Sequence, residues 1–164
     1  FPQNPFPMNT PFQSLVDEFL NSKRIAVVGY SRKAGVANGI YDKFKKHGYE
    51  VFAVTPKASE FTEIQAWSDL KSIAGSVDAV MICTPPAASA GVIREAADLG
   101  IPLVWIHRSV DGGSYSAEAE KLAHERGVKL IPFGCPMMFL KPDIFHGCMK
   151  WFFNMQGKFQ VAES

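Results

Sequence analysis

The strongest constraint in this sequence is a regular alternation between short apolar runs and segments with helical periodicity. The apolar runs occupy residues 24–29, 49–54, 77–83, 103–106 and 128–131. The helical segments between them, each followed by a glycine, occupy residues 36–47, 87–99 and 116–126. Near-continuous apolar runs are typical of strands buried on both faces of a parallel sheet, with the helices as right-handed crossovers. The pattern predicts an α/β fold with a doubly wound, open, parallel sheet of five strands.

Two more helices are indicated in the first half of the chain. Apolar spacing predicts a helix over residues 10–20, with Thr10 as its N-cap and Pro11 at the first helical position. Residues 68–73 favour a short helix capped by Ser68.

We expect the chain to divide into three parts. Residues 1–9 are interpreted as a tag remnant or disordered extension, with the native start at Met8. Residues 10–136 form a single domain. Residues 137–164 form an aromatic-rich extension packed on that domain or on a partner, in which residues 143–154 suit a last helix.

Composition and charge exclude several classes of protein. The chain has 164 residues, enough for one domain, and its 47% hydrophobic and 20% charged content is typical of a globular protein. A net charge of +1 gives no electrostatic reason to bind nucleic acid or an acidic membrane. No apolar run is long enough for a membrane span, and no signal peptide pattern is present. Three cysteines without a C-x-x-C motif favour a reducing, cytoplasmic location over a disulfide framework.

The loop after the first apolar run has the position of a phosphate-binding loop but lacks the G-x-G-x-x-G pattern. Gly29 is followed by Tyr30 and Ser31 instead of a second glycine. Gly29 permits a tight turn, Ser31 offers a hydroxyl, and Arg32 and Lys33 add positive charge. Backbone N–H groups at the start of the following helix favour an anion. The loop is therefore a candidate phosphate site, and the alternative is an ordinary strand–helix turn with solvated bases.

The loop after the second run discriminates between nucleotides. Proteins that bind NAD usually place an acid here, to hold the ribose hydroxyls. This chain has Val54, Thr55, Pro56 and Lys57. A lysine suits a phosphate on the ribose instead, either the 2′-phosphate of NADP or the 3′-phosphate of coenzyme A. In the alternative interpretation Lys57 is an ordinary surface residue and Pro56 only ends the strand.

The loops after the third and fourth runs complete the same edge of the sheet. Thr84, Pro85 and Pro86 would form a stiff, apolar wall for an adenine, although Thr84 would serve equally as a helix cap. Cys83 is expected to be a buried structural thiol. His107 and Arg108 would lie at the rim of the same cleft, where they would meet a phosphate or a carboxylate or be solvated.

An ordered set of short motifs resembles one protein family. The motifs include Gly-Tyr-Ser at 29–31, Val-Thr-Pro-Lys at 54–57, Pro-Pro at 85–86, Val-Trp-Ile at 104–106 and Cys-Pro at 135–136. Together they resemble the small bacterial CoA-binding proteins and are similar to the CoA-binding N-terminal domain of the succinyl-CoA synthetase α subunit. The resemblance extends over roughly residues 20–136 and implies a Rossmann-like CoA-binding domain.

The resemblance also implies roles for individual residues. The phosphates of CoA would lie against one set of loop residues: Gly29, Tyr30, Ser31 and Arg32. Contacts to the nucleotide would come from Val54, Pro56 and Lys57, with Lys57 near a phosphate. Thr84, Pro85 and Pro86 would flank the adenine, and Ile93 would line the pocket. The chain departs from the family pattern at Tyr30, at residues 107–109 and in its longer aromatic tail.

These patterns support a function without catalysis. No nucleophile–base motif and no zinc-ligand spacing is present, and no metal is expected. The synthetase activity does not carry over, because this chain has no room for the domain that bears the phosphorylated histidine. We therefore expect non-catalytic binding of CoA or acyl-CoA, as a carrier, sensor or regulatory protein. The alternatives are an NADP-dependent oxidoreductase, or a non-catalytic subunit of a larger acyl-CoA enzyme. Such a subunit, or a homodimer, would associate through Phe145, Trp151 and Phe152.

Overall fold

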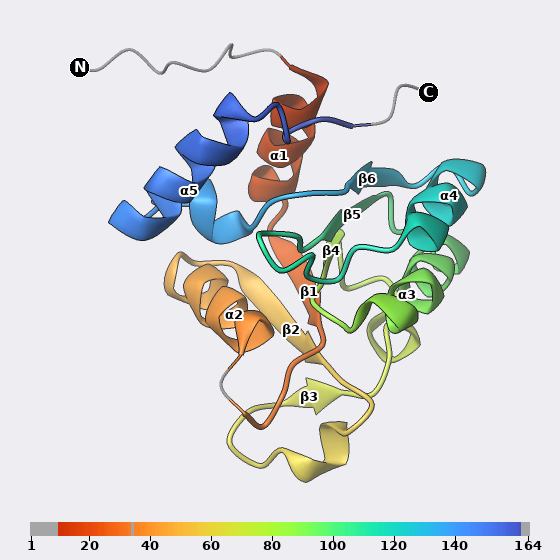
Figure 1. Ribbon diagram of the computed structural model, residues 1–164. Coiled ribbons are helices and arrows are strands. Elements are labelled where there is room, and N and C mark those ends of the chain that lie inside the picture. The colour runs from red at the N-terminus through yellow and green to blue at the C-terminus, as the bar shows by residue number, and fades with distance from the viewer. Residues whose placement is uncertain (1–9, 34, 162–164) are drawn as a thin grey trace.

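A parallel sheet of six strands forms the centre of the protein in the computed structural model, which describes residues 10–33 and 35–161 (Figure 1). The predicted extension at residues 1–9 lies outside the described residues. The strand order is β3-β2-β1-β4-β5-β6. The strands are β1 (Arg24–Val28), β2 (Glu50–Val54), β3 (Ala66–Trp67), β4 (Ala79–Ile82), β5 (Leu103–Ile106) and β6 (Lys129–Ile131). The α/β fold with a parallel sheet is confirmed.

The predicted number of strands was wrong by one. The additional strand, β3, has two residues and pairs in parallel with β2 through Ala53–Ala66 and Val54–Trp67. Two residues are too few to show an alternating or continuous apolar pattern, so this strand carries no signal of its own. It extends the sheet on the side of β2 that faces away from β1.

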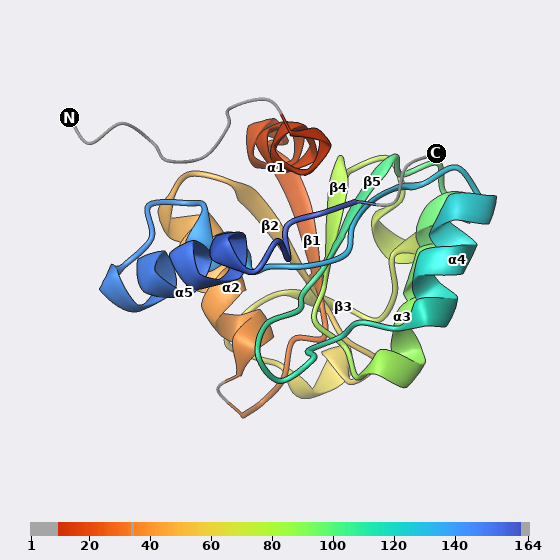
Figure 2. The same cartoon turned by 45° about the horizontal axis from the view of Figure 1, so that its top comes forward.

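Helices cover both faces of the sheet, as Figures 1 and 2 show. The helices are α1 (Pro11–Asn21), α2 (Val36–Lys46), α3 (Pro86–Asp98), α4 (Ala117–Glu125) and α5 (Ile144–Met155). Helices α1, α2 and α5 lie on one side, and α3 and α4 lie on the other. Helix α2 follows β1, and α3 follows the neighbouring β4. Because α2 and α3 lie on opposite faces of the sheet, the chain leaves the ends of these two adjacent strands in opposite directions. That is the position at which open parallel sheets bind ligands.

Each strand contributes to two separate apolar cores. In β1, Ile25 and Val27 pack with α1 and α2, whereas Ala26 and Val28 pack with α3 and α4. Successive side chains of a strand point to opposite faces, so a strand covered on both faces needs apolar residues at every position. The continuous apolar runs of the sequence are the direct result.

The helix ends confirm most of the capping predictions and correct one. Thr10 Oγ1 accepts a hydrogen bond from the Gln13 N–H at 3.1 Å, and Pro11 is the first residue of α1. Ser68, in contrast, does not cap a helix. Asp69 Oδ1 accepts from the Ser72 N–H at 2.8 Å, and only a 3₁₀ turn over Lys71–Ile73 follows. The Lys71 N–H, which a Ser68 cap would bond, donates instead to the Glu95 carboxylate at 3.0 Å.

The aromatic tail returns to the domain. Phe153 of α5 is buried and packs edge-on against Phe133, with ring centroids 5.0 Å apart. Phe159 stacks on Phe12 of α1, also at 5.0 Å. These contacts fix the end of the chain against the face that α1 and α2 cover. Among the described residues, no helix is both long enough and apolar enough to cross a membrane.

Candidate functional site

Gly29 joins the ends of three neighbouring strands. Its N–H donates to the Val54 carbonyl at 2.9 Å, and the Cys83 N–H donates to the Val28 carbonyl at 2.8 Å. Gly29 has φ +110°, and a Cβ at this position would lie 2.6 Å from the Cys83 carbonyl oxygen. Only glycine fits this backbone and this space. We name the three segments that meet here, residues 29–33, 54–57 and 84–86, the strand-end loops.

The first strand-end loop is fixed by Asn38, which the sequence analysis missed. The Asn38 Nδ2 donates to the Ser31 carbonyl at 2.7 Å, and its Oδ1 accepts from the Ser31 N–H at 3.1 Å. The Ser31 hydroxyl accepts from the Lys33 N–H at 3.1 Å. Helix α2 begins after Gly35, which supplies no side-chain acceptor to the helix N-terminus. The loop therefore leads into a helix end whose N–H groups and dipole favour an anion.

Two other residues of this loop contact the protein itself. The Tyr30 ring packs edge-on against Tyr41 and Phe61, with centroids 5.2 and 5.4 Å away. The Arg32 guanidinium donates to the Glu60 carbonyl at 3.0 Å and lies 3.9 Å from the Glu60 carboxylate. Both side chains thus connect the first strand-end loop to the segment that follows the second.

The second strand-end loop exposes a cation. Val54 is buried, whereas Pro56 and Lys57 are exposed. Within the described residues, no carboxylate lies at ion-pair distance from the Lys57 ammonium. Since the Arg32 guanidinium already has acceptors, Lys57 is the less engaged of these two cations.

The third strand-end loop presents two prolines to solvent. Pro85 and Pro86 are exposed, and Pro86 is the first residue of α3. Thr84 does not cap this helix, because Pro85 occupies the N-cap position. The Thr84 hydroxyl instead forms a hydrogen bond with the Ser89 hydroxyl at 3.1 Å. Ser89 is completely buried and donates to the Ser114 carbonyl at 2.7 Å, which ties this loop to the one after β5.

One predicted residue packs in the core instead of lining a cavity. Ile93 was expected to line the pocket, but it packs between α3 and the sheet and lines neither of the two cavities described next. Apolar residues on the inner face of a crossover helix contact the strands, and the resemblance alone did not distinguish this face from the rim. We leave Ile93 out of the site.

His107 lies at the wall of an apolar cavity of about 320 Å³ beside the strand-end loops. Its N–H donates to the Ile82 carbonyl at 3.0 Å, and the side chain is buried. Burial lowers the pKa of His107, which favours the neutral imidazole. Burial also raises the pKa of the Cys135 thiol, in the same cavity wall, to about 12. This thiol is therefore protonated near neutral pH and is a poor nucleophile.

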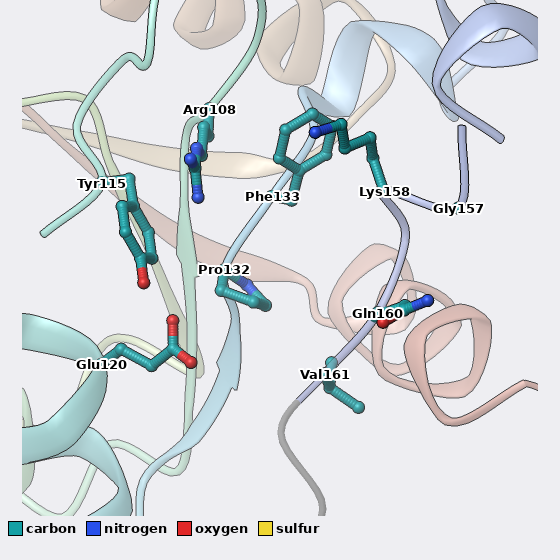
Figure 3. A pocket seen from close by; sticks show the side chains of 9 residues that line it. All are labelled: Arg108, Tyr115, Glu120, Pro132, Phe133, Gly157, Lys158, Gln160 and Val161. Carbon is teal, nitrogen blue, oxygen red and sulfur yellow. The ribbon is translucent and has the colours of Figure 1, made fainter. Parts of the chain in front are cut away.

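Arg108 does not share that cavity. It lines a second cavity of about 370 Å³, between Tyr115 and Glu120 on one side and residues 157–161 on the other (Figure 3). The Arg108 guanidinium lies 4.0 Å from the centroid of the Tyr115 ring. The prediction that His107 and Arg108 occupy one rim was wrong, because neighbouring residues at the end of an extended strand point in opposite directions. The described residues contain no cluster of side chains suited to a metal ion.

Comparison with known proteins gives a consistent result. The CoA binding domain family matches residues 23–141 of this chain. The uncharacterized protein YneT of Bacillus subtilis is 31% identical over 126 residues, which cover 76% of this chain and 90% of YneT. The α subunit of ADP-forming acetate–CoA ligase II from Pyrococcus furiosus is 27% identical over 134 residues. That match covers 74% of this chain but only 28% of the ligase subunit.

Two solved structures from archaea have the same fold. A hypothetical protein from Pyrococcus horikoshii superimposes with a TM-score of 0.68 at 25% identity, over 79% of this chain and 89% of that protein. A dinucleotide-forming acetyl-coenzyme A synthetase 1 of Ca. Korarchaeum cryptofilum gives a TM-score of 0.59 at 22% identity. It covers 74% of this chain and 27% of the synthetase chain, and its likeness is one of fold.

Proposed function

This chain belongs to the family of CoA-binding domains, and from that premise we propose that it binds coenzyme A or an acyl-CoA at the strand-end loops. We further propose that it acts without catalysis, as a carrier, sensor or regulatory protein. The observation that carries the proposal is the junction at Gly29, where three strand ends meet and the loops that follow them lead to a helix N-terminus and carry three cations, Arg32, Lys33 and Lys57. This arrangement suits a nucleotide with several phosphates.

Each strand-end loop has a role in this proposal. The diphosphate lies against residues 29–33 and the first turn of α2, where backbone N–H groups point outward. The 3′-phosphate meets the ammonium of Lys57. The adenine lies against Pro85 and Pro86, which are rigid and exposed. Val54 supports the site through its carbonyl rather than its buried side chain.

Two observations support a role without catalysis. Burial raises the pKa of both Cys83 and Cys135, so neither thiol is an activated nucleophile. The described residues hold no metal-ligand cluster. A cytoplasmic location belongs to the same proposal and is supported by the three cysteines, all of which are free thiols.

Thermal unfolding with four nucleotides at equal concentration tests the proposal. CoA should raise the melting temperature most, dephospho-CoA less, and NAD and NADP little. A ligand at about 1,000 times its Kd stabilises the folded state by about 4 kcal/mol, which is readily measured. A shift with NADP alone would contradict CoA binding and favour the oxidoreductase alternative.

The exposed face of α5 supports association with a second copy of this chain. Three apolar side chains at helical spacing, Ile144, Trp151 and Met155, are 88%, 56% and 69% exposed. Together with Cys148 they form an uncharged stripe, which would face its own copy without like-charge repulsion. Sedimentation velocity should show a dimer that Trp151→Glu dissociates. A monomeric wild-type protein would contradict self-association and leave an acyl-CoA enzyme as the candidate partner of this face.

A further inference from the structure

We propose that the cavity beside α5 binds the apolar acyl chain of an acyl-CoA thioester. The cavity lies between the first turns of α2, the loop after β5, the turn over Pro136–Met138 and α5. We name it the acyl cavity. This inference rests on the proposed function, and it identifies the ligand as an acyl-CoA with an aliphatic chain.

The wall of the acyl cavity has the chemistry that an aliphatic chain requires. Most of its lining is apolar, including Ile40, Met137, Met138 and Met149. Methionine side chains are unbranched and flexible, so they adapt to ligands of different length. The volume of about 320 Å³ lies at the lower end of the range for small-molecule pockets, roughly 300 to 1,000 Å³. A short or medium acyl chain matches this size better than a whole cofactor.

Exposed apolar side chains gather at this cavity. The large apolar residues that are exposed in the described part of the chain are Val36, Val110, Ile144, Phe145, Trp151, Phe152 and Met155. Three of them, Val36, Val110 and Phe145, line the acyl cavity. They come from three separate segments and are 48%, 77% and 69% exposed. A bound aliphatic chain would remove apolar surface from water at all three.

The position of the cavity matches the direction of an extended CoA molecule. Val36 is the first residue of α2, directly after the loop proposed for the diphosphate. Lys57 follows β2, on one side of β1, whereas His107 follows β5, beyond β4 on the other side. For a ligand whose ribose phosphate meets Lys57 and whose diphosphate lies at α2, we place the thioester near His107, with the pantetheine arm between the diphosphate and the cavity. The acyl chain would then enter the cavity.

Helix α5 lies outside the residues that the family match covers, and it closes one side of this cavity. The family match ends at residue 141, and Phe145, His146 and Met149 come after that point. Asp143 caps the helix by accepting from the His146 N–H at 2.8 Å, and the buried Phe153 anchors its other end. The outer wall of the cavity is thus held in place at both ends of α5.

Gly39 provides a direct test because it lies within helix α2 and lines the acyl cavity. A Cβ at Gly39 would have nothing within 4 Å, so a larger side chain fits without a backbone clash. Leucine also favours a helix more than glycine does. Gly39→Leu would fill the cavity while the helix is retained. Gly91→Leu is the matched control, since Gly91 also lies in a helix with open space around its Cβ, outside this cavity.

Isothermal titration calorimetry with CoA, butyryl-CoA, hexanoyl-CoA and octanoyl-CoA measures the contribution of the acyl chain. In the wild-type protein and in Gly91→Leu, affinity should rise by up to about fourfold for each methylene group until the cavity is full. In Gly39→Leu, the affinity for octanoyl-CoA should exceed the affinity for CoA by about twofold or less. Phe145→Ser, a change at an exposed position, should reduce the same ratio.

The outcomes separate this inference from the proposed function. If CoA binds but octanoyl-CoA binds no more than twofold tighter, the acyl cavity is overturned and CoA binding stands. If Gly39→Leu keeps the full gain from the acyl chain, the chain lies elsewhere and the inference is equally overturned. If none of the four compounds binds, the proposed function itself fails and this inference fails with it.

Discussion

The strand-end loops and the acyl cavity lie at the same edge of the sheet, but they are built in different ways. The loops are fixed by main-chain bonds around Gly29 and by the Asn38 side chain. The cavity is enclosed by side chains from four segments that are distant in the sequence, and α5 completes it. The loop geometry is therefore a local property of the fold, whereas the cavity depends on the packing of one helix near the end of the chain.

The largest expected effect comes from breaking the loop junction. In Gly29→Ala, a Cβ would lie 2.6 Å from the Cys83 carbonyl oxygen, at φ +110°. The free energy of unfolding should fall by roughly 3 kcal/mol or more, and CoA binding should be lost. Urea denaturation measures the free energy of unfolding, and calorimetry measures CoA binding.

The matched control for this junction is Gly48→Ala. Gly48 also has a positive φ, +87°, but nothing lies within 4 Å of its would-be Cβ. Only backbone strain remains, which costs about 1–2 kcal/mol. Equal losses of stability in the two variants would contradict the conclusion that Gly29 is the contact point of three strand ends.

A smaller effect should distinguish Lys57 from Arg32. Lys57→Gln should weaken CoA binding about tenfold, because a charge-assisted hydrogen bond contributes roughly 1.5–3 kcal/mol. Binding of dephospho-CoA should be nearly unchanged, since it lacks the 3′-phosphate. Arg32→Gln, measured in the same titrations, should cost less for CoA, because the Arg32 guanidinium already contacts Glu60. The assignment of Lys57 fails if Lys57→Gln weakens both ligands equally.

The smallest effect is the pH dependence of stability that comes from His107, in the wall of the acyl cavity. Burial lowers the pKa of His107, while the Asp111 carboxylate opposes this shift and His146 adds to it. As the pH falls below about 6.5, the unfolded chain takes up a proton that the folded protein does not, so stability decreases. At higher pH His107 is neutral in both states and contributes no pH dependence.

Replacing His107 tests whether it causes this loss of stability at low pH. The loss of unfolding free energy between about pH 7.5 and pH 5.5 should be smaller in His107→Gln than in the wild type. An unchanged slope in His107→Gln would show that other groups account for the whole dependence.

The sequence predicted the loops better than the cavity for a physical reason. The apolar runs, the helix caps and the order of the loops are local patterns, and the structure confirms the alternation they indicate. Two residues of β3 are too few to form such a pattern, and the Lys71 N–H that a Ser68 cap would bond donates to Glu95 instead. Both errors concern segments of only a few residues.

Long-range packing accounts for the remaining differences. Ile93 was expected to line the pocket and is buried, because its helix presents that face to the sheet. Asn38 was missed, although an asparagine in the first turn of a helix after a serine-containing loop is a recognisable bonding partner. The convergence of Val36, Val110 and Phe145 has no local signal, since these residues are far apart in the sequence.

A crystal structure of the protein with octanoyl-CoA tests the central claim most directly. We predict the diphosphate against residues 29–33 and the N-terminus of α2, with the 3′-phosphate at Lys57. The octanoyl chain should lie in the acyl cavity, in contact with Phe145. A nucleotide bound away from the strand-end loops, for example in the cavity beside Arg108, would contradict the account.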